Sequence, residues 1–225
     1  MRQRRRLRRF AAALVLLLIA FGPAAVRAAS SPDPVLLVHG WRGAAADWSV
    51  MVQRFTDEGL GRQIVAIQLP GQDNVANARA IASTVASNGW TRFDIVGVSM
   101  GGLSARQFVK ALGGTATVDG YVSLGTPQYG IWAACLLAQA QGGQMCPTSS
   151  FLKSLNAGDD TPGNVRYMTL TSPSDKTVPS NATRLDGGAC YVSVPGVEHT
   201  TYEEDPNVFA AVVSAIDGGC PGTFK

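Results

Sequence analysis

The chain has 225 residues, 46% of them hydrophobic, and a formal net charge of +3. This length permits a single domain with a sizeable core. Basic residues cluster only at the N-terminus, the four cysteines and two histidines lack the spacing of a metal site, and no phosphate-binding glycine motif occurs. We therefore expect no nucleic-acid partner and no metal.

The first 28 residues have the three-part layout of a secretory signal peptide. Six arginines stand among the first ten residues, an apolar run extends from Phe10 to Phe21, and small residues precede a cleavage site near Ala28. The run is shorter than the ~20 residues that span a bilayer. We predict a signal peptide at 1–28, a single domain at 29–225, a secreted, extracellular protein and no stable membrane insertion after cleavage.

Removal of this segment reverses the sign of the net charge. Seven of the 19 lysines and arginines leave with it, so the mature chain keeps twelve basic and sixteen acidic residues. Four cysteines in an exported chain indicate two disulfides. Three pairings are possible, and proximity along the chain favours Cys135 with Cys146 and Cys190 with Cys220.

Short runs rich in β-branched residues alternate with amphipathic stretches along the chain. The runs predict strands at Val35–His39, Ile64–Ile67, Phe93–Val98, Val118–Leu124, Val165–Thr171 and Cys190–Val194. Helical spacing of apolar residues predicts helices near Trp48–Phe55, Val75–Ser87, Ser99–Ala111 and Phe209–Ile216. Buried strands that alternate with helices form a parallel sheet covered on both faces. The sequence thus predicts an α/β fold with a mostly parallel, twisted sheet of about six strands.

One region, 125–164, interrupts this alternation. About 40 residues separate two predicted strands there, and the front part, Ile131–Ala140, is strongly apolar. We interpret this part as a helix packed on the sheet. An apolar wall of a groove, or a small lid, is the alternative.

A glycine–x–serine–x–glycine motif runs from Gly97 to Gly101. The pattern can arise by chance in a chain with 25 glycines, so its context decides. Ser99 follows a predicted strand and precedes a predicted helix, an arrangement that places serine in a tight turn above the sheet edge. Strand and helix approach closely beside such a turn, which favours glycine on either side. We predict that Ser99 is a catalytic nucleophile.

A serine hydroxyl needs a base, and imidazole is the usual base near neutral pH. The chain offers His39, which precedes the serine, and His199, in a loop after the last parallel strand. The order serine, acid, histidine is characteristic of catalytic sites built on a strand–serine–helix turn, and it selects His199.

The acid should lie between Ser99 and His199, after a strand. Asp175 follows the predicted strand Val165–Thr171 directly and fits best, with a role in orienting the imidazole. Asp159 and Asp160 precede that strand, at its wrong end, and Asp186 is the reserve candidate.

An oxyanion hole requires two backbone N–H groups. We expect one from Met100, at the N-terminus of a helix, and one from Trp41, in the loop after the first strand. Apolar residues expected near the site are Trp41, Met100, Ile131, Trp132, Leu136, Leu137, Val178 and Val197.

The motifs "PVLLVHGWRG", "FDIVGVSMGGLSARQFVK", "LGTPQYG" and "TSPSDKTVP" together resemble the secreted bacterial class 2 lipases, which are compact α/β-hydrolases similar to the small Bacillus lipases. The resemblance extends from about Val35 to the C-terminal helix. It implies an α/β-hydrolase fold with a minimal lid or none, a triad of Ser99, Asp175 and His199, and a structural role for His39. The chain departs from the Bacillus type in its longer, cysteine-bearing segment 125–164.

The resemblance implies a serine esterase or lipase that hydrolyses acyl glycerols or similar lipid esters, without a cofactor and at a lipid–water interface. We expect a monomer. Other reactions use the same triad, among them acyl transfer and hydrolysis of polyesters or cutin. A non-catalytic secreted module is the alternative of a different class.

Overall fold

A computed structural model describes residues 32–224 of the chain. The predicted signal peptide at 1–28 lies outside the described residues. No helix within 32–224 is long and apolar enough to cross a membrane.

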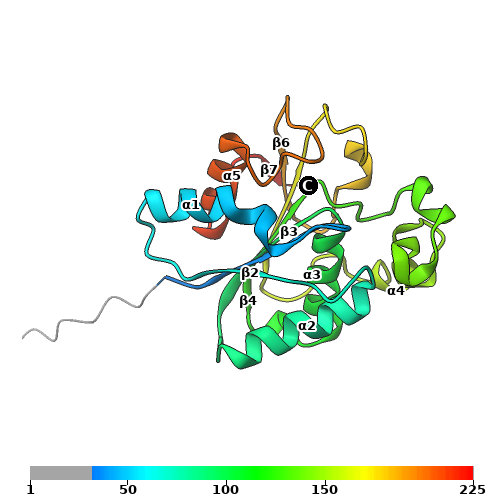
Figure 1. The fold of residues 1–225 in the computed structure, drawn as a ribbon, viewed down its shortest axis with the longest axis horizontal. Coiled ribbons are helices and arrows are strands. Elements are labelled where there is room, and N and C mark those ends of the chain that lie inside the picture. Colours follow the sequence, from blue (N-terminus) through cyan, green and yellow to red (C-terminus); the bar gives the residue numbers. More distant parts are fainter. Residues whose placement is uncertain (1–31, 225) are drawn as a thin grey trace, which may run out of the picture. The chain divides into compact units, whose positions relative to one another are not determined.

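The core of the protein is a seven-stranded sheet in the order β2-β1-β3-β4-β5-β6-β7 (Figure 1). The strands are β1 Val35–Val38, β2 Ile64–Ile67, β3 Phe93–Val98, β4 Val118–Leu124, β5 Arg166–Thr171, β6 Cys190–Ser193 and β7 Thr223–Phe224. Strands β1 to β6 pair in parallel, and β7 adds a short antiparallel edge. The predicted fold class is therefore confirmed, with one more strand than expected.

Helices cover both faces of the sheet, as a parallel sheet requires. They are α1 Ser49–Asp57, α2 Asn74–Ser87, α3 Met100–Ala111, α4 Ser150–Leu155 and α5 Pro206–Ile216. One hydrophobic cluster joins α1 and α5 to one face, and a second joins α2 and α3 to the other. Figure 1 shows these two pairs on opposite sides of the sheet.

The alternation of side chains along each strand determines which face a residue joins. In β1, Val35 and Leu37 belong to the cluster with α1 and α5, whereas Leu36 and Val38 belong to the cluster with α2 and α3. All four are fully buried. A strand buried on both faces must be apolar throughout, which explains why the sequence shows continuous apolar runs there.

The interpretation of Ile131–Ala140 as a helix packed on the sheet is wrong. The segment consists of short 3₁₀ turns at Trp132–Leu136 and Gln139–Gln141, and Trp132 and Leu136 are 71% and 91% exposed. The region instead packs through α4, Ala134 and Met145 against the first turn of α3, in a third small cluster. The apolar composition of this segment predicted a buried helix. Its 3₁₀ turns are too short to form a continuous helical face that could pack on the sheet.

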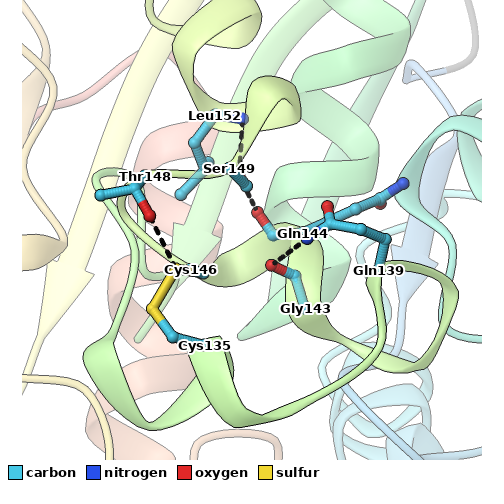
Figure 2. Close-up of a disulfide and its surroundings, with 8 residues drawn as sticks. All are labelled: Cys135, Gln139, Gly143, Gln144, Cys146, Thr148, Ser149 and Leu152. Atoms are coloured by element: carbon cyan, nitrogen blue, oxygen red, sulfur yellow. Dashed lines mark hydrogen bonds between the residues drawn. A yellow bond between two sulfur atoms is a disulfide. The ribbon is translucent and has the colours of Figure 1, made fainter.

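Both predicted disulfides are present. Cys135 is bonded to Cys146, which closes the 3₁₀ turns into a loop, and Cys190 in β6 is bonded to Cys220 beyond α5. Figure 2 shows the first of these beside two hydrogen bonds of Ser149, whose hydroxyl donates to the Gln144 carbonyl at 2.7 Å and accepts from the Leu152 amide at 3.1 Å. The apolar segment is thus fixed at its base although its tip is exposed.

Candidate active site

Ser99 occupies a strained turn between β3 and α3. Its backbone has φ 52° and ψ −126°, a conformation that residues other than glycine rarely adopt. Strain of this kind costs about 1–3 kcal/mol and persists only where the surroundings enforce it. Here the Ser99 N–H donates to the Leu124 carbonyl of β4 at 2.8 Å, and α3 begins at the next residue.

The glycines on either side allow the strand and the helix to touch. A Cβ atom on Gly97 would lie 2.6 Å from the Gly102 nitrogen and 2.7 Å from the Gly101 carbonyl carbon. A Cβ atom on Gly101 would collide with the carbonyl oxygens of Val38, the last residue of β1, and of His39, which follows it. Since these neighbours are backbone atoms that cannot rotate away, both positions require glycine.

Ser99, His199 and Asp175 form one chain of hydrogen bonds. The Ser99 Oγ lies 3.0 Å from Nε2 of His199, and Nδ1 of the same ring lies 2.8 Å from Oδ2 of Asp175. Each residue comes from a segment that follows the carboxyl end of a strand, β3, β6 and β5 respectively. These strands are parallel, and β4 alone separates β3 from the adjacent pair β5 and β6, so three residues distant in sequence meet at one edge of the sheet.

The Asp175 carboxylate is buried and held by several donors. Its side chain is 0% exposed, and Oδ1 accepts hydrogen bonds from the amides of Thr177 and Val178 at 2.8 and 2.9 Å. Burial alone raises the pKa of Asp175, but the hydrogen bonds from His199 and the two amides outweigh it, so the pKa lies below its usual value. The carboxylate therefore remains ionised beside the imidazole.

The other acids considered from the sequence lie elsewhere. Asp160 accepts from buried Arg106 at 2.5 Å and from the Tyr129 hydroxyl at 2.5 Å, and Asp159 accepts from the Thr161 amide. The reserve candidate, Asp186, is exposed. None of them contacts His199 within residues 32–224.

His39 has a structural position. It is 1% exposed, and its Nε2 accepts from the Leu69 amide at 3.0 Å. That bond leaves the proton on Nδ1, which donates to the Gly40 carbonyl at 2.9 Å. The ring thus joins the loop after β1 to the loop after β2, and it makes no contact with Ser99.

The two expected oxyanion donors border the nucleophile. Met100 follows Ser99 at the start of α3, and Gly40 packs so tightly on Ser99 that an added Cβ would lie 3.1 Å from the serine Cβ. Trp41 follows Gly40 and lines the same pocket. Among residues 32–224, neither the Met100 nor the Trp41 backbone N–H donates to another group, so both are free to bind an oxyanion.

A pocket of about 390 Å³ opens beside Ser99 and His199. Its lining residues are Gly40, Trp41, Gly43, Asp47, Val98, Ser99, Ile131, Met145, Thr177, His199, Thr200, Glu203 and Glu204. The pocket has an apolar wall from the loop after β1 and the 131–146 segment, and an acidic wall from Asp47, Glu203 and Glu204. Such a pocket can hold a mainly apolar ester with its carbonyl near Ser99. No group of three His, Cys, Asp or Glu side chains in the described part of the chain could hold a metal ion.

The pocket wall was only partly predictable. Eight apolar residues were expected near the site, and two of them, Trp41 and Ile131, line the pocket. The others are buried in the core (Met100, Val178 and Val197), exposed (Trp132 and Leu136) or partly exposed outside the pocket lining (Leu137). The acidic wall and the buried Tyr202 were missed. Neither has a periodic pattern, and only the proximity of Tyr202 to His199 in "EHTTYEE" hinted at a role.

The chain belongs to the alpha/beta hydrolase family, whose model matches residues 35–148, just over half of the chain. Its fold is similar to that of Aspergillus fumigatus lipase B, with a TM-score of 0.69 and 18% identity over 85% of this chain and 54% of that one. It is also similar to mature Bacillus licheniformis lipase BlEst2, with a TM-score of 0.68 and 16% identity over 84% and 93% of the two chains. The chain thus spans about half of the fungal protein and nearly all of the bacterial one. At these identities the likeness concerns the fold.

The close contact between β3 and α3 gives a first prediction. Gly97→Ala should lower the free energy of unfolding by about 3 kcal/mol, because the added methyl group would collide with the backbone of Gly101 and Gly102 at the start of α3. Gly71→Ala is the matched control, since a Cβ atom there has no neighbour within 4 Å. Urea denaturation of both variants measures the difference in stability. Equal unfolding midpoints for Gly97→Ala and Gly71→Ala would show that position 97 tolerates a side chain and would contradict the prediction.

A second prediction concerns Glu203, in the pocket wall. Burial raises its pKa to about 7, and the nearby charge of Asp47 adds to the shift. An unfolded glutamate titrates near pH 4.3, so between ~4.3 and 7 the folded state binds more protons than the unfolded state. This residue should therefore make the protein less stable as the pH rises through that range, with the full loss above pH 7.

Glu203→Gln should remove this part of the pH dependence. Between pH 4.5 and 7.5 we expect the variant to lose about 2–3 kcal/mol less unfolding free energy than the wild type. Exposed Glu58→Gln is the control and should follow the wild type. Urea denaturation at both pH values measures the slopes, and identical slopes for Glu203→Gln and wild type would contradict the prediction.

Proposed function

We propose that the protein is a secreted serine esterase or lipase that hydrolyses carboxylic esters, such as acyl glycerols, through an acyl-enzyme. The observation that carries this proposal is the hydrogen-bonded chain from Ser99 through His199 to Asp175, with the serine in a strained turn beside a pocket. Membership in the alpha/beta hydrolase family supports it.

In the first half-reaction, Ser99 Oγ attacks the ester carbonyl carbon while Nε2 of His199 takes the hydroxyl proton. The tetrahedral intermediate collapses, the C–O bond to the alcohol breaks, and the alcohol leaves with the proton from His199. Water then attacks the acyl carbon while His199 takes its proton. The bond between that carbon and Ser99 Oγ breaks, His199 returns the proton to Oγ, and the carboxylic acid is released. Asp175 stays ionised throughout and stabilises the imidazolium.

The negative charge of the tetrahedral intermediate needs donors that are already in place. The free backbone N–H groups of Met100 and Trp41 would supply them, and the N-terminal end of α3 adds a favourable dipole. Loss of one such donor typically raises the barrier by about 2.7–4 kcal/mol. His39 would act indirectly, because its bonds to Gly40 and Leu69 hold the loop that carries Trp41.

The proposal includes a compact, secreted lipase of bacterial class 2, acting as a monomer. The four motifs in their expected order support the class, and the near-complete coverage of the mature Bacillus licheniformis lipase BlEst2 fits its compact size. Two disulfides fit an extracellular protein. Cleavage near Ala28 would release the mature chain.

An ester held at a lipid–water interface is the proposed substrate form. From Gly120 to Leu152 the chain has no charged residue. Within that stretch Ile131 lines the pocket, while Trp132 and Leu136 stand exposed on the disulfide-closed turn next to it. An uncharged, apolar rim suits contact with a neutral lipid surface.

The nucleophile is tested by Ser99→Ala. Hydrolysis of p-nitrophenyl butyrate should fall to the background rate, and covalent labelling by a fluorophosphonate should disappear, while the circular dichroism spectrum is retained. Ser154 is an exposed serine on α4, so Ser154→Ala is the control, and it should retain both ester hydrolysis and fluorophosphonate labelling. Unchanged hydrolysis by Ser99→Ala would end the proposal.

The rim is tested by the double variant Trp132→Ser/Leu136→Ser. We expect hydrolysis of emulsified triolein to fall about tenfold, because burial of these side chains in the lipid is lost, with little change for dissolved p-nitrophenyl butyrate. Leu112→Ser removes an exposed leucine at the far end of α3 and should leave both rates unchanged. Equal losses on the two substrates would argue against surface contact.

A further inference from the structure

Tyr202 is a buried tyrosine that contacts two members of the proposed triad. It is 0% exposed and lies in the turn between His199 and α5. Its ring packs edge-to-face on the His199 imidazole, with centroids 6.2 Å apart and an interplanar angle of 88°. The absence of a side chain at Gly125 makes room for the tyrosine, because a Cβ there would collide with its ring.

The Tyr202 hydroxyl donates to Oδ2 of Asp175 at 3.2 Å. The same oxygen accepts the hydrogen bond from Nδ1 of His199, whereas the two backbone amides donate to the other oxygen, Oδ1. Within residues 32–224, His199 and Tyr202 are the only side chains that donate to this carboxylate. The phenol and the imidazole therefore share one acceptor atom.

We propose that Tyr202 is a positioning residue that orients the Asp175 carboxylate and moderates its charge, and so sets the pH range over which His199 is a free base. The inference rests on the proposed esterase function. Glu203, which lines the same pocket, also interacts with His199 through its charge, and Tyr202→Phe leaves this residue in place. A donor on Oδ2 withdraws negative charge that would otherwise stabilise the imidazolium. It also fixes the carboxylate plane, which in turn directs the His199 ring at Ser99.

Two further features fit this role. Burial and the negative charge of Asp175 both raise the pKa of Tyr202, so the phenol remains a donor at every pH at which the enzyme would work. The edge-to-face contact also limits rotation of the His199 ring, and phenylalanine would preserve that contact. Tyr202→Phe therefore removes the hydroxyl and leaves the packing.

The test is the pH dependence of kcat and KM for Tyr202→Phe with p-nitrophenyl butyrate. We expect kcat to fall about tenfold with KM unchanged, because the bond acts on the base and not on substrate binding. The acidic limb of kcat/KM should move up by about half a pH unit, because the less screened carboxylate favours the imidazolium. Tyr129→Phe is the control, since that hydroxyl also donates to a carboxylate, on Asp160, away from the site.

A second readout is independent of activity. The chain has two histidines, so NMR titration of their ring protons, assigned with His199→Ala, should show a higher midpoint for His199 in Tyr202→Phe than in the wild type. An unchanged midpoint, or a lower kcat with an unmoved acidic limb, would overturn the role of Tyr202. Failure of the wild type to hydrolyse any ester or to react with a fluorophosphonate would instead refute the proposed function.

Discussion

The contact between strand β3 and helix α3 is the constraint on which the site depends. The chain reverses direction at Ser99 within one residue, and it can do so only because Gly97 and Gly101 carry no side chain. The strained backbone that results raises the hydroxyl above the sheet edge, and the Met100 amide has no hydrogen-bond partner within the described range 32–224. Backbone strain, glycine and a free amide are thus consequences of one close approach.

The electrostatics of the site follow from what surrounds Asp175. Burial opposes ionisation of this carboxylate, but hydrogen bonds from the His199 ring and from two backbone amides reverse the effect. The Tyr202 phenol donates a further hydrogen bond to the same carboxylate. The amides belong to the same turn as Asp175, so their bonds form wherever that turn forms. The two rings belong to the segment after β6, and the pairing of β6 with β5 brings that segment beside Asp175.

The pocket combines walls of different chemistry. The segment around Ile131 is uncharged and closed by the Cys135–Cys146 disulfide, while Asp47 and Glu203 contribute acidic side chains to the same pocket. Burial of Glu203 raises its pKa, so the acidic wall carries less charge at neutral pH than its composition indicates.

The sequence by itself determined the layered α/β fold and the candidate nucleophile. Continuous apolar runs encode strands buried on both faces, and the strand–serine–helix spacing around Ser99 encodes its turn, because both depend on near neighbours. His199 and Asp175 followed from elimination and chain order. Tertiary structure alone decided the rest: the 3₁₀ turns that replace an expected helix at Ile131–Ala140, the acidic pocket wall and the bond from Tyr202 to Asp175. Those features depend on the order in which the strands pair and on how the loops pack at the strand ends. Neither can be read from the periodicity of residues that are close in sequence.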